Sequence, residues 1–178
     1  DGKDFKPVFG IEAYFLPSID EWREELEKAK ANKKAKRKID KSQAGTTIED
    51  ESTKREVKNV LNRRRHLILL AQNQTGLNNI FSLVSKSYSE ANFYRFPRMD
   101  YKLLKEHSDG VIAASACLGG VYAGNYWENI EQGEKSVLSV MRDTTESMLD
   151  VFGDRWYGEL QWNNIKEQHH LNKLIVQV

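Results

Sequence analysis

Residues 66–88, HLILLAQNQTGLNNIFSLVSKSY, decide the fold class, because they join a short apolar run to an amphipathic segment. Residues 66–71 have the length and continuous apolar character of a buried strand. The apolar residues that follow are spaced for one face of a helix: Leu77, Ile80, Phe81 and Val84. This stretch therefore predicts a buried strand followed by a helix.

Strand-like segments also lie on both sides of this unit. Residues 7–16, PVFGIEAYFL, are rich in aromatic and β-branched residues and reach Pro17, which suits a buried strand that ends in a turn. Residues 96–120, FPRMDYKLLKEHSDGVIAASACLGG, contain a second apolar run at 111–116. A turn with two glycines is expected directly after it, over residues 115–120.

The C-terminal part continues the alternation of helix and strand. A long apolar-faced helix is predicted to end at Gly153, where a left-handed residue is favoured. Residues 156–161 predict another strand and residues 166–178 a further helix. Strand alternating with helix predicts a parallel sheet with helices outside it, hence an α/β fold or part of a barrel.

Residues 18–64 differ in composition from their surroundings and predict a charged helical insertion between two strands. The segment that begins SIDEWREELEKAKANKKAKRK carries its acids early and its bases late, which complements a helix dipole. Residues 39–53 are polar and without pattern, so a flexible loop is expected there. A second basic helix is predicted over residues 54–64.

The basic residues of the insertion leave two interpretations open. The lysines and arginines between residues 28 and 41 are suited to meeting phosphates, because neutralised phosphates release counterions. A solvated helix face balanced by its own glutamates is the alternative, and the interleaved acids favour it. A DNA-tracking role for residues 33–41 is therefore a secondary hypothesis.

The composition is that of a soluble globular protein, with 39% hydrophobic and 30% charged residues. The net charge is only +1, from 27 basic and 26 acidic residues, so attraction to nucleic acid has to come from local patches. A single cysteine excludes an internal disulfide and fits a reducing compartment. With no apolar run near the length of a membrane span and no signal-peptide pattern, we expect a cytoplasmic protein without membrane contact.

Three residues of metal-ligand type lie in or beside the predicted strands. Cys117 follows a strand, the position where functional groups of parallel α/β proteins gather, while Glu12 lies within a strand and His66 opens one. A thiolate, a carboxylate and a neutral imidazole suit zinc or a related divalent ion. Taken singly, Cys117 also fits a small buried hydrophobe, His66 a strand-end residue and Glu12 the solvent side of its strand.

The remaining motifs and histidines offer little chemistry. His107 is predicted to end a helix before a turn, and His169 and His170 to lie exposed on a charged helix. The sequence contains no nucleophile elbow, phosphate loop or dinucleotide fingerprint. Neither is a base identifiable for a serine or cysteine triad.

Four segments in order carry a resemblance to a known family: residues 6–15, 66–88, 93–120 and 152–164, the last reading FGDRWYGELQWNN. They closely resemble the N-terminal PHP (polymerase and histidinol phosphatase) domain of the bacterial DNA polymerase III alpha subunit. The resemblance covers nearly everything outside the 18–64 insertion. It implies a partial distorted β/α (TIM-like) barrel of the PHP type with the basic helical insertion added to it.

The resemblance also implies a metal site. In this family the barrel binds divalent metals through His, Asp, Glu and Cys side chains, and the matching residues here are Glu12, His66 and Cys117. The expected ions are zinc, manganese or iron. The family's His-x-His, Asp-His-Gly and Asp-x-His motifs are absent from the sequence. We therefore expect residues 1–178 to be an internal fragment of one PHP domain that is inactive alone.

Two functions follow from the resemblance. Some members have a metal-dependent 3′–5′ exonuclease activity, and the three visible ligands favour this function for the parent polymerase. In others the domain is a scaffold that docks a proofreading subunit and braces the polymerase domain. The implied partners are DNA and deoxynucleotides, a proofreading subunit and a sliding clamp, with magnesium in a polymerase domain outside this chain. A small phosphoesterase is a third alternative, which the polymerase-like segments 93–100 and 105–120 disfavour.

Overall fold

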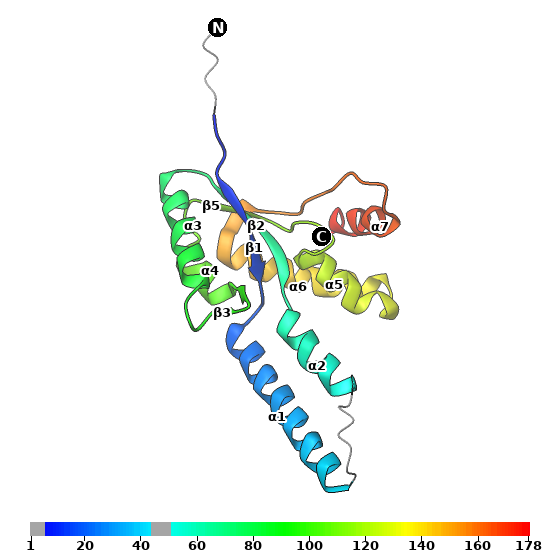
Figure 1. Cartoon of the computed structure of the whole chain (residues 1–178). Helices are drawn as coiled ribbons and strands as arrows, with labels where there is room; N and C mark the ends of the chain where they lie inside the picture. The colour runs from blue at the N-terminus through cyan, green and yellow to red at the C-terminus, as the bar shows by residue number, and fades with distance from the viewer. Residues whose placement is uncertain (1–5, 44–50) are drawn as a thin grey trace.

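A four-stranded sheet forms the centre of the fold in the computed structural model, which describes residues 6–43 and 51–178 (Figure 1). The strand order is β1-β2-β5-β6. The strands are β1 (Gly10–Phe15), β2 (Arg65–Ala71), β5 (Val111–Ala114) and β6 (Trp156–Tyr157). The first three confirm the predicted strands: β1 and β5 are shorter than expected, and β2 begins one residue earlier. The strand expected over residues 156–161 is only two residues long.

The sheet is mixed, so the prediction of a parallel sheet is wrong. β1 pairs with β2 and β2 with β5 in antiparallel fashion, and only β5 and β6 are parallel. Each antiparallel connection contains two main helices rather than one, and the chain returns to the end of the sheet that it left. Phe15 at the end of β1 pairs with Arg65 at the start of β2, and Ala71 at the end of β2 pairs with Val111 at the start of β5. The sheet does not close into a barrel within residues 6–43 and 51–178.

The helices form the rest of the fold. Within the insertion lie α1 (Ile19–Gln43) and α2 (Glu51–Asn62). Between β2 and β5 are α3 (Gln74–Ser87), the hairpin of β3 (Phe93–Tyr94) with β4 (Phe96–Pro97), and α4 (Tyr101–Glu106). After β5 come α5 (Val121–Asn129), the short η1 (Ile130–Gln132), α6 (Glu134–Phe152), η2 (Gly153–Arg155) and α7 (Lys166–Ile175). No helix in the described part of the chain combines the length and the apolar character needed to cross a membrane.

The two faces of the sheet differ in burial because side chains alternate along each strand. Ala13, Phe15, Leu67 and Leu69 point to one face and are at most 5% exposed. They pack in the main core with residues of α3, α4, α5, α6 and α7. The alternate residues, among them Glu12, Tyr14, His66 and Ile68, are half-buried or exposed. This second face carries the candidate site.

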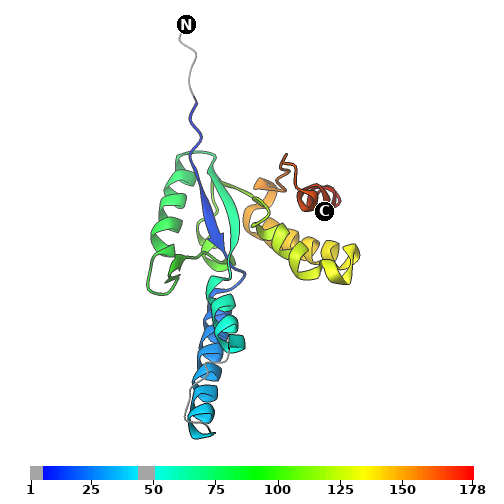
Figure 2. The ribbon, with the colours of Figure 1, turned by 45° about the vertical axis from the view of Figure 1, so that its right-hand side comes forward.

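The insertion forms a helical hairpin that projects from one end of the sheet (Figures 1 and 2). It has a small core of its own at its base, made of Leu16, Ile19, Trp22, Leu26, Val60 and Leu61. The indole N–H of Trp22 donates to the carbonyl of Val60 at 2.7 Å, which ties α1 to α2. The two helices predicted within residues 18–64 are therefore confirmed.

The boundaries of the insertion helices differ from those expected. The flexible loop predicted over residues 39–53 is wrong at both margins, because residues 39–43 continue α1 and residues 51–53 begin α2. Residues 39–43 contain no Gly or Pro, and polar residues with ordinary helix propensity extend a helix readily. Residues 44–50 of the predicted loop lie outside the described residues.

Arg98 holds the insertion to the rest of the fold. Its side chain is fully buried and donates to the carbonyls of Tyr94, Phe96 and Leu61 at 2.8, 3.0 and 2.6 Å. The guanidinium carbon lies 4.1 Å from the ring centroid of Trp22. Burial, with a smaller contribution from the charge of Arg64, lowers the pKa of Arg98 to about 10, so it remains a cation at neutral pH.

Candidate metal centre

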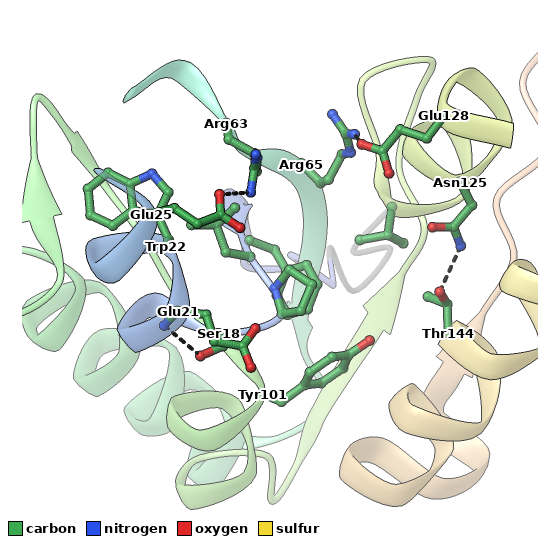
Figure 3. A pocket seen from close by; sticks show the side chains of 14 residues that line it. Ser18, Glu21, Trp22, Glu25, Arg63, Arg65, Tyr101, Asn125, Glu128 and Thr144 are labelled. Carbon is green, nitrogen blue, oxygen red and sulfur yellow. Dashed lines mark hydrogen bonds and ion pairs between the residues drawn. The ribbon is translucent and has the colours of Figure 1, made fainter. Parts of the chain in front are cut away.

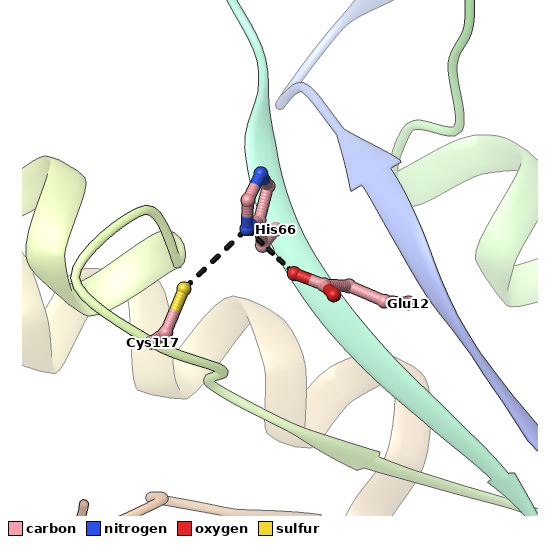
Figure 4. A group of neighbouring side chains, drawn as sticks. All are labelled: Glu12, His66 and Cys117. Carbon is pink, nitrogen blue, oxygen red and sulfur yellow. Dashed lines mark hydrogen bonds and ion pairs between the residues drawn. The ribbon is translucent and has the colours of Figure 1, made fainter.

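Glu12 and His66 meet on the open face of the sheet because of the register between β1 and β2. Tyr14 is opposite His66 and Glu12 is opposite Ile68, so Glu12 and His66 are diagonal neighbours on one face. The imidazole Nδ1 of His66 lies 2.6 Å from the Oε1 oxygen of Glu12 (Figure 4). Two predicted ligands from different strands are thus in direct contact.

Cys117 reaches the same imidazole from the loop that follows β5. Its Sγ atom lies 3.4 Å from Nδ1 of His66, and it accepts a hydrogen bond from the N–H of Gly119 at 3.3 Å. The N–H of His66 donates to the carbonyl of Gly119 at 2.8 Å, which fastens the loop to the start of β2. The loop therefore brings the thiol to the histidine through backbone contacts as well as through the side chain.

The shape of this loop depends on its small residues. Ala116 has a φ of 60°, a left-handed conformation that is uncommon for residues other than glycine. A Cβ atom at Gly120 would lie 2.0 Å from the carbonyl oxygen of Ser115, so any side chain there would force the loop to move. The glycines of the predicted turn thus serve to place Cys117.

The three predicted residues form one cluster, in which all the ligand atoms lie within 4.8 Å of one another. We call Glu12, His66 and Cys117 the ligand cluster. The side chains of His66 and Glu12 are 31% and 50% exposed, so the cluster is open to a ligand from outside. No further His, Cys, Asp or Glu joins it among the residues that the structure describes.

The donor geometry fits part of a metal site. Tetrahedral zinc with ordinary bond lengths places a ligand nitrogen and a ligand sulfur about 3.5 Å apart. The separation of 3.4 Å between His66 and Cys117 agrees with this spacing. The 2.6 Å contact of Glu12 with His66 has the length of a hydrogen bond, so an ion bound by both requires the half-exposed carboxylate to turn away from the imidazole. The cluster thus supplies three donors of the right chemistry and leaves room for others.

The other histidines do not join the cluster. His107 caps the C-terminus of α4, as predicted, and burial lowers its pKa from the ordinary value. His169 is exposed as expected. The predicted exposure is wrong for His170, which is half-buried and lies between the hydroxyl of Tyr126 at 3.2 Å and the carboxylate of Glu134 at 2.7 Å. These contacts tie α7 to α5 and to the start of α6.

A cavity of about 430 Å³ lies at the base of the insertion, with walls from α1, β1, α4, α5 and α6 (Figure 3). Two ion pairs lie in its walls: Arg63 with Glu25 at 2.5 Å, and Arg65 with Glu128. Asn125 donates to the hydroxyl of Thr144 at 2.7 Å in the same wall. Phe15 and Arg65 line it, so it lies on the face of the sheet away from the ligand cluster, and we assign it no ligand.

Comparison with known proteins gives a consistent picture. The family model described as "PHP domain" matches residues 1–163. The DNA polymerase III subunit alpha of Aquifex aeolicus is 32% identical over 173 residues, which is 97% of this chain and 12% of that protein. The same-named protein of Deinococcus radiodurans is 28% identical over 98% of this chain, and that of Helicobacter pylori strain 26695 is 37% identical over 65%, each match covering 10% of the relative. The chain spans about a tenth of the length of these relatives.

Proposed function

Because this chain belongs to the PHP domain family, we propose that it is part of the N-terminal PHP domain of a DNA polymerase III alpha subunit. The similarity to the Aquifex aeolicus protein over 97% of the chain carries this proposal. Residues 1–178 are then an internal fragment of one domain, with 18–64 as an insertion. The parent extends DNA with deoxynucleotides, using magnesium in a separate polymerase domain, and contacts a proofreading subunit and a sliding clamp.

The open face of the sheet supports a barrel in the full-length protein. Besides the ligand cluster, this face carries the apolar residues Ile68, Leu70, Ile112 and Ala114, which are only half-buried. An apolar sheet face is stable when another layer covers it. We propose that further strands of the parent close around this face, so that the ligand cluster lies inside a distorted TIM-like barrel.

The ligand cluster supports a divalent-metal site for phosphodiester hydrolysis. The 3′–5′ polarity that we propose follows from the family resemblance alone. Zinc, manganese or iron fits its imidazole, thiol and carboxylate. A bound ion of this kind supplies an acidified water and positive charge opposite a phosphate. Within this chain His66, Cys117 and Glu12 act as ligands, and the loop after β5 orients the thiol through the N–H of Gly119. The remaining ligands are assigned to other parts of the parent.

The test is the metal content of the full-length protein, purified without chelator, beside its Glu12→Ala variant. We expect stoichiometric zinc, manganese or iron in the unaltered protein, a loss of at least half of it in the variant, and a matching loss of exonuclease rate. Glu106→Ala is the matched control, because Glu106 pairs with Lys86 at 3.4 Å, outside the cluster. Equal metal content and equal exonuclease rates in all three proteins would contradict the metal function.

A scaffold role is the second candidate, and the 2.6 Å contact of Glu12 with His66 favours it. This contact satisfies both side chains without an ion. In this case the domain docks the proofreading subunit and braces the polymerase domain. This role predicts that the protein purified without chelator contains no zinc, manganese or iron. It also predicts that Glu12→Ala weakens binding of the proofreading subunit.

A further inference from the structure

A band of aromatic rings and cationic side chains begins beside the ligand cluster and extends to the tip of the β3–β4 hairpin. We call it the aromatic track. It consists of Tyr14, Phe96 and Tyr94 with the cations Arg64, Arg95 and Lys30. These residues come from β1, the segment before β2, the hairpin and α1, so only the fold brings them together.

The inner end of the track touches the ligand cluster. Tyr14 is opposite His66 in the β1–β2 ladder, and the two ring centroids are 5.6 Å apart. The Tyr14 ring meets Phe96 edge to face, with centroids 5.7 Å apart. Phe96 and Tyr94 are paired across the hairpin, so their side chains share one face of it. The rings thus lead away from His66 in order.

Cations accompany the rings along this path. The guanidinium carbon of Arg64 lies 4.8 Å from the Tyr14 centroid and 4.1 Å from that of Phe96. At the outer end, the Lys30 ammonium and the Arg95 guanidinium lie 5.5 and 6.0 Å from the Tyr94 centroid.

The positive charge of the track is only partly compensated. Lys30 also pairs with Glu27 at 2.7 Å. Neither Arg64 nor Arg95 forms an ion pair with another residue that the structure describes. The track is therefore a local positive surface on a chain whose net charge is only +1.

The outer part of the track is accessible. Tyr94 is 39% exposed, and Arg95 is exposed at the hairpin tip with a φ of 60°. Aromatic rings that stack on bases, alternating with cations that meet phosphates, are the combination that binds single-stranded nucleic acid without sequence preference. Uncompensated guanidinium groups favour such a polyanion over a protein partner.

We propose that the aromatic track binds the last nucleotides of a single DNA strand and leads its 3′ end to the ligand cluster. The proposal rests on the proposed function, which supplies the class of substrate. Tyr94 and Tyr14 stack on bases, while Arg95 and Arg64 meet phosphates. The track positions the strand, and the ligand cluster remains the reactive part of the site.

The test uses the full-length protein and oligo-dT probes that carry a photoreactive iodouracil at one of the last few nucleotides in turn, from the 3′ end inward, with a chelator present. We expect cross-links to peptides that contain Tyr94, Phe96 or Tyr14.

Tyr94→Leu should weaken binding at this site about tenfold, the effect of one stacked base. Arg95→Gln should reduce the slope of log affinity against log salt by about 0.7, the value for one phosphate contact of a single strand. Phe81→Leu is the control, since Phe81 is 60% exposed on α3 and lies outside the track.

The outcomes separate this inference from the function on which it rests. Cross-links in the track that fall in Tyr94→Leu but not in Phe81→Leu support it, even if the protein proves free of metal. Cross-links elsewhere, or equal cross-linking in Tyr94→Leu and the unaltered protein, overturn it even if Glu12→Ala removes both metal and hydrolysis. Weaker binding of a protein subunit by Tyr94→Leu, with DNA cross-linking unchanged, also overturns it.

Discussion

Gly120 controls the position of Cys117 although it contributes no ligand atom. A Cβ atom there would lie 2.0 Å from the carbonyl oxygen of Ser115 and 2.9 Å from that of Cys117, and both contacts are to backbone rather than to a flexible side chain. We expect Gly120→Ala to lower the free energy of unfolding by about 1–3 kcal/mol, the usual effect of overpacking. Metal content should fall with it, because the loop moves the thiol away from His66. Thermal unfolding and elemental analysis measure the two effects.

The companion variant is Ala116→Gly in the same loop. It removes the side chain from a residue with a φ of 60° and leaves the contacts of Cys117 in place. We expect its stability to remain within about 1 kcal/mol of the unaltered protein, because relief of the left-handed conformation and the flexibility of glycine oppose each other. A loss as large as that of Gly120→Ala would show that any change in this loop is damaging, and the steric explanation would be wrong.

His107 makes stability depend on pH. Burial, assisted by the charge of Lys86 and opposed by Glu106, lowers its pKa below the ordinary 6.5, so the folded protein favours the neutral imidazole. His107 therefore binds a proton more readily in the unfolded chain than in the folded one. Its contribution to the free energy of unfolding is complete above pH 6.5 and declines as the pH falls through the folded-state pKa. Replacement with asparagine, which suits a helix C-terminus, should remove this dependence. Denaturant midpoints of both proteins at pH 7.5 and 5.5 measure it, and an equal drop in both would show that His107 is not responsible.

At the scale of elements, Arg98 connects the insertion to the β3–β4 hairpin. It donates to Leu61 at the end of α2 and to Tyr94 and Phe96 of the hairpin. We expect Arg98→Lys to lower the free energy of unfolding by about 1–3 kcal/mol, because an ammonium cannot reach carbonyls in both elements as a planar guanidinium does. Thermal unfolding measures this loss. Arg95→Lys is the control, since Arg95 is exposed and should change stability by less than about 0.5 kcal/mol.

Element types were predictable from the sequence, but strand directions were not. The apolar runs at 66–71 and 111–116 identify two strands, and Gly153, with a φ of 59°, ends α6 as expected. Alternation of strand with helix did not reveal how many helices each connection contains. This number decides whether the chain returns to the same end of the sheet, so the antiparallel pairing of β1 with β2 and of β2 with β5 was missed.

At the scale of the whole molecule, the ligand cluster could be predicted only in part from spacing. Cys117 was identifiable by its position after a strand. Glu12 and His66 were candidates by residue type, but their strand positions argued for them more weakly and the family resemblance was needed to select them. Arg98 was missed because a fully buried arginine contradicts the usual preference of charged residues for the surface. The aromatic track was missed because its members come from four separate segments, which carry no common pattern.

The insertion has a consequence for how such a chain can change over evolution. Its two ends are held together by the pairing of Phe15 with Arg65 and by the small core at its base. The entropy of closing a loop grows only slowly with its length once the ends are fixed. The distal part of the hairpin is therefore free to lengthen, shorten or accept foreign sequence while the end of the sheet that carries Phe15 and Arg65 keeps its register. It is the natural place to attach a fluorophore or an affinity handle to this protein.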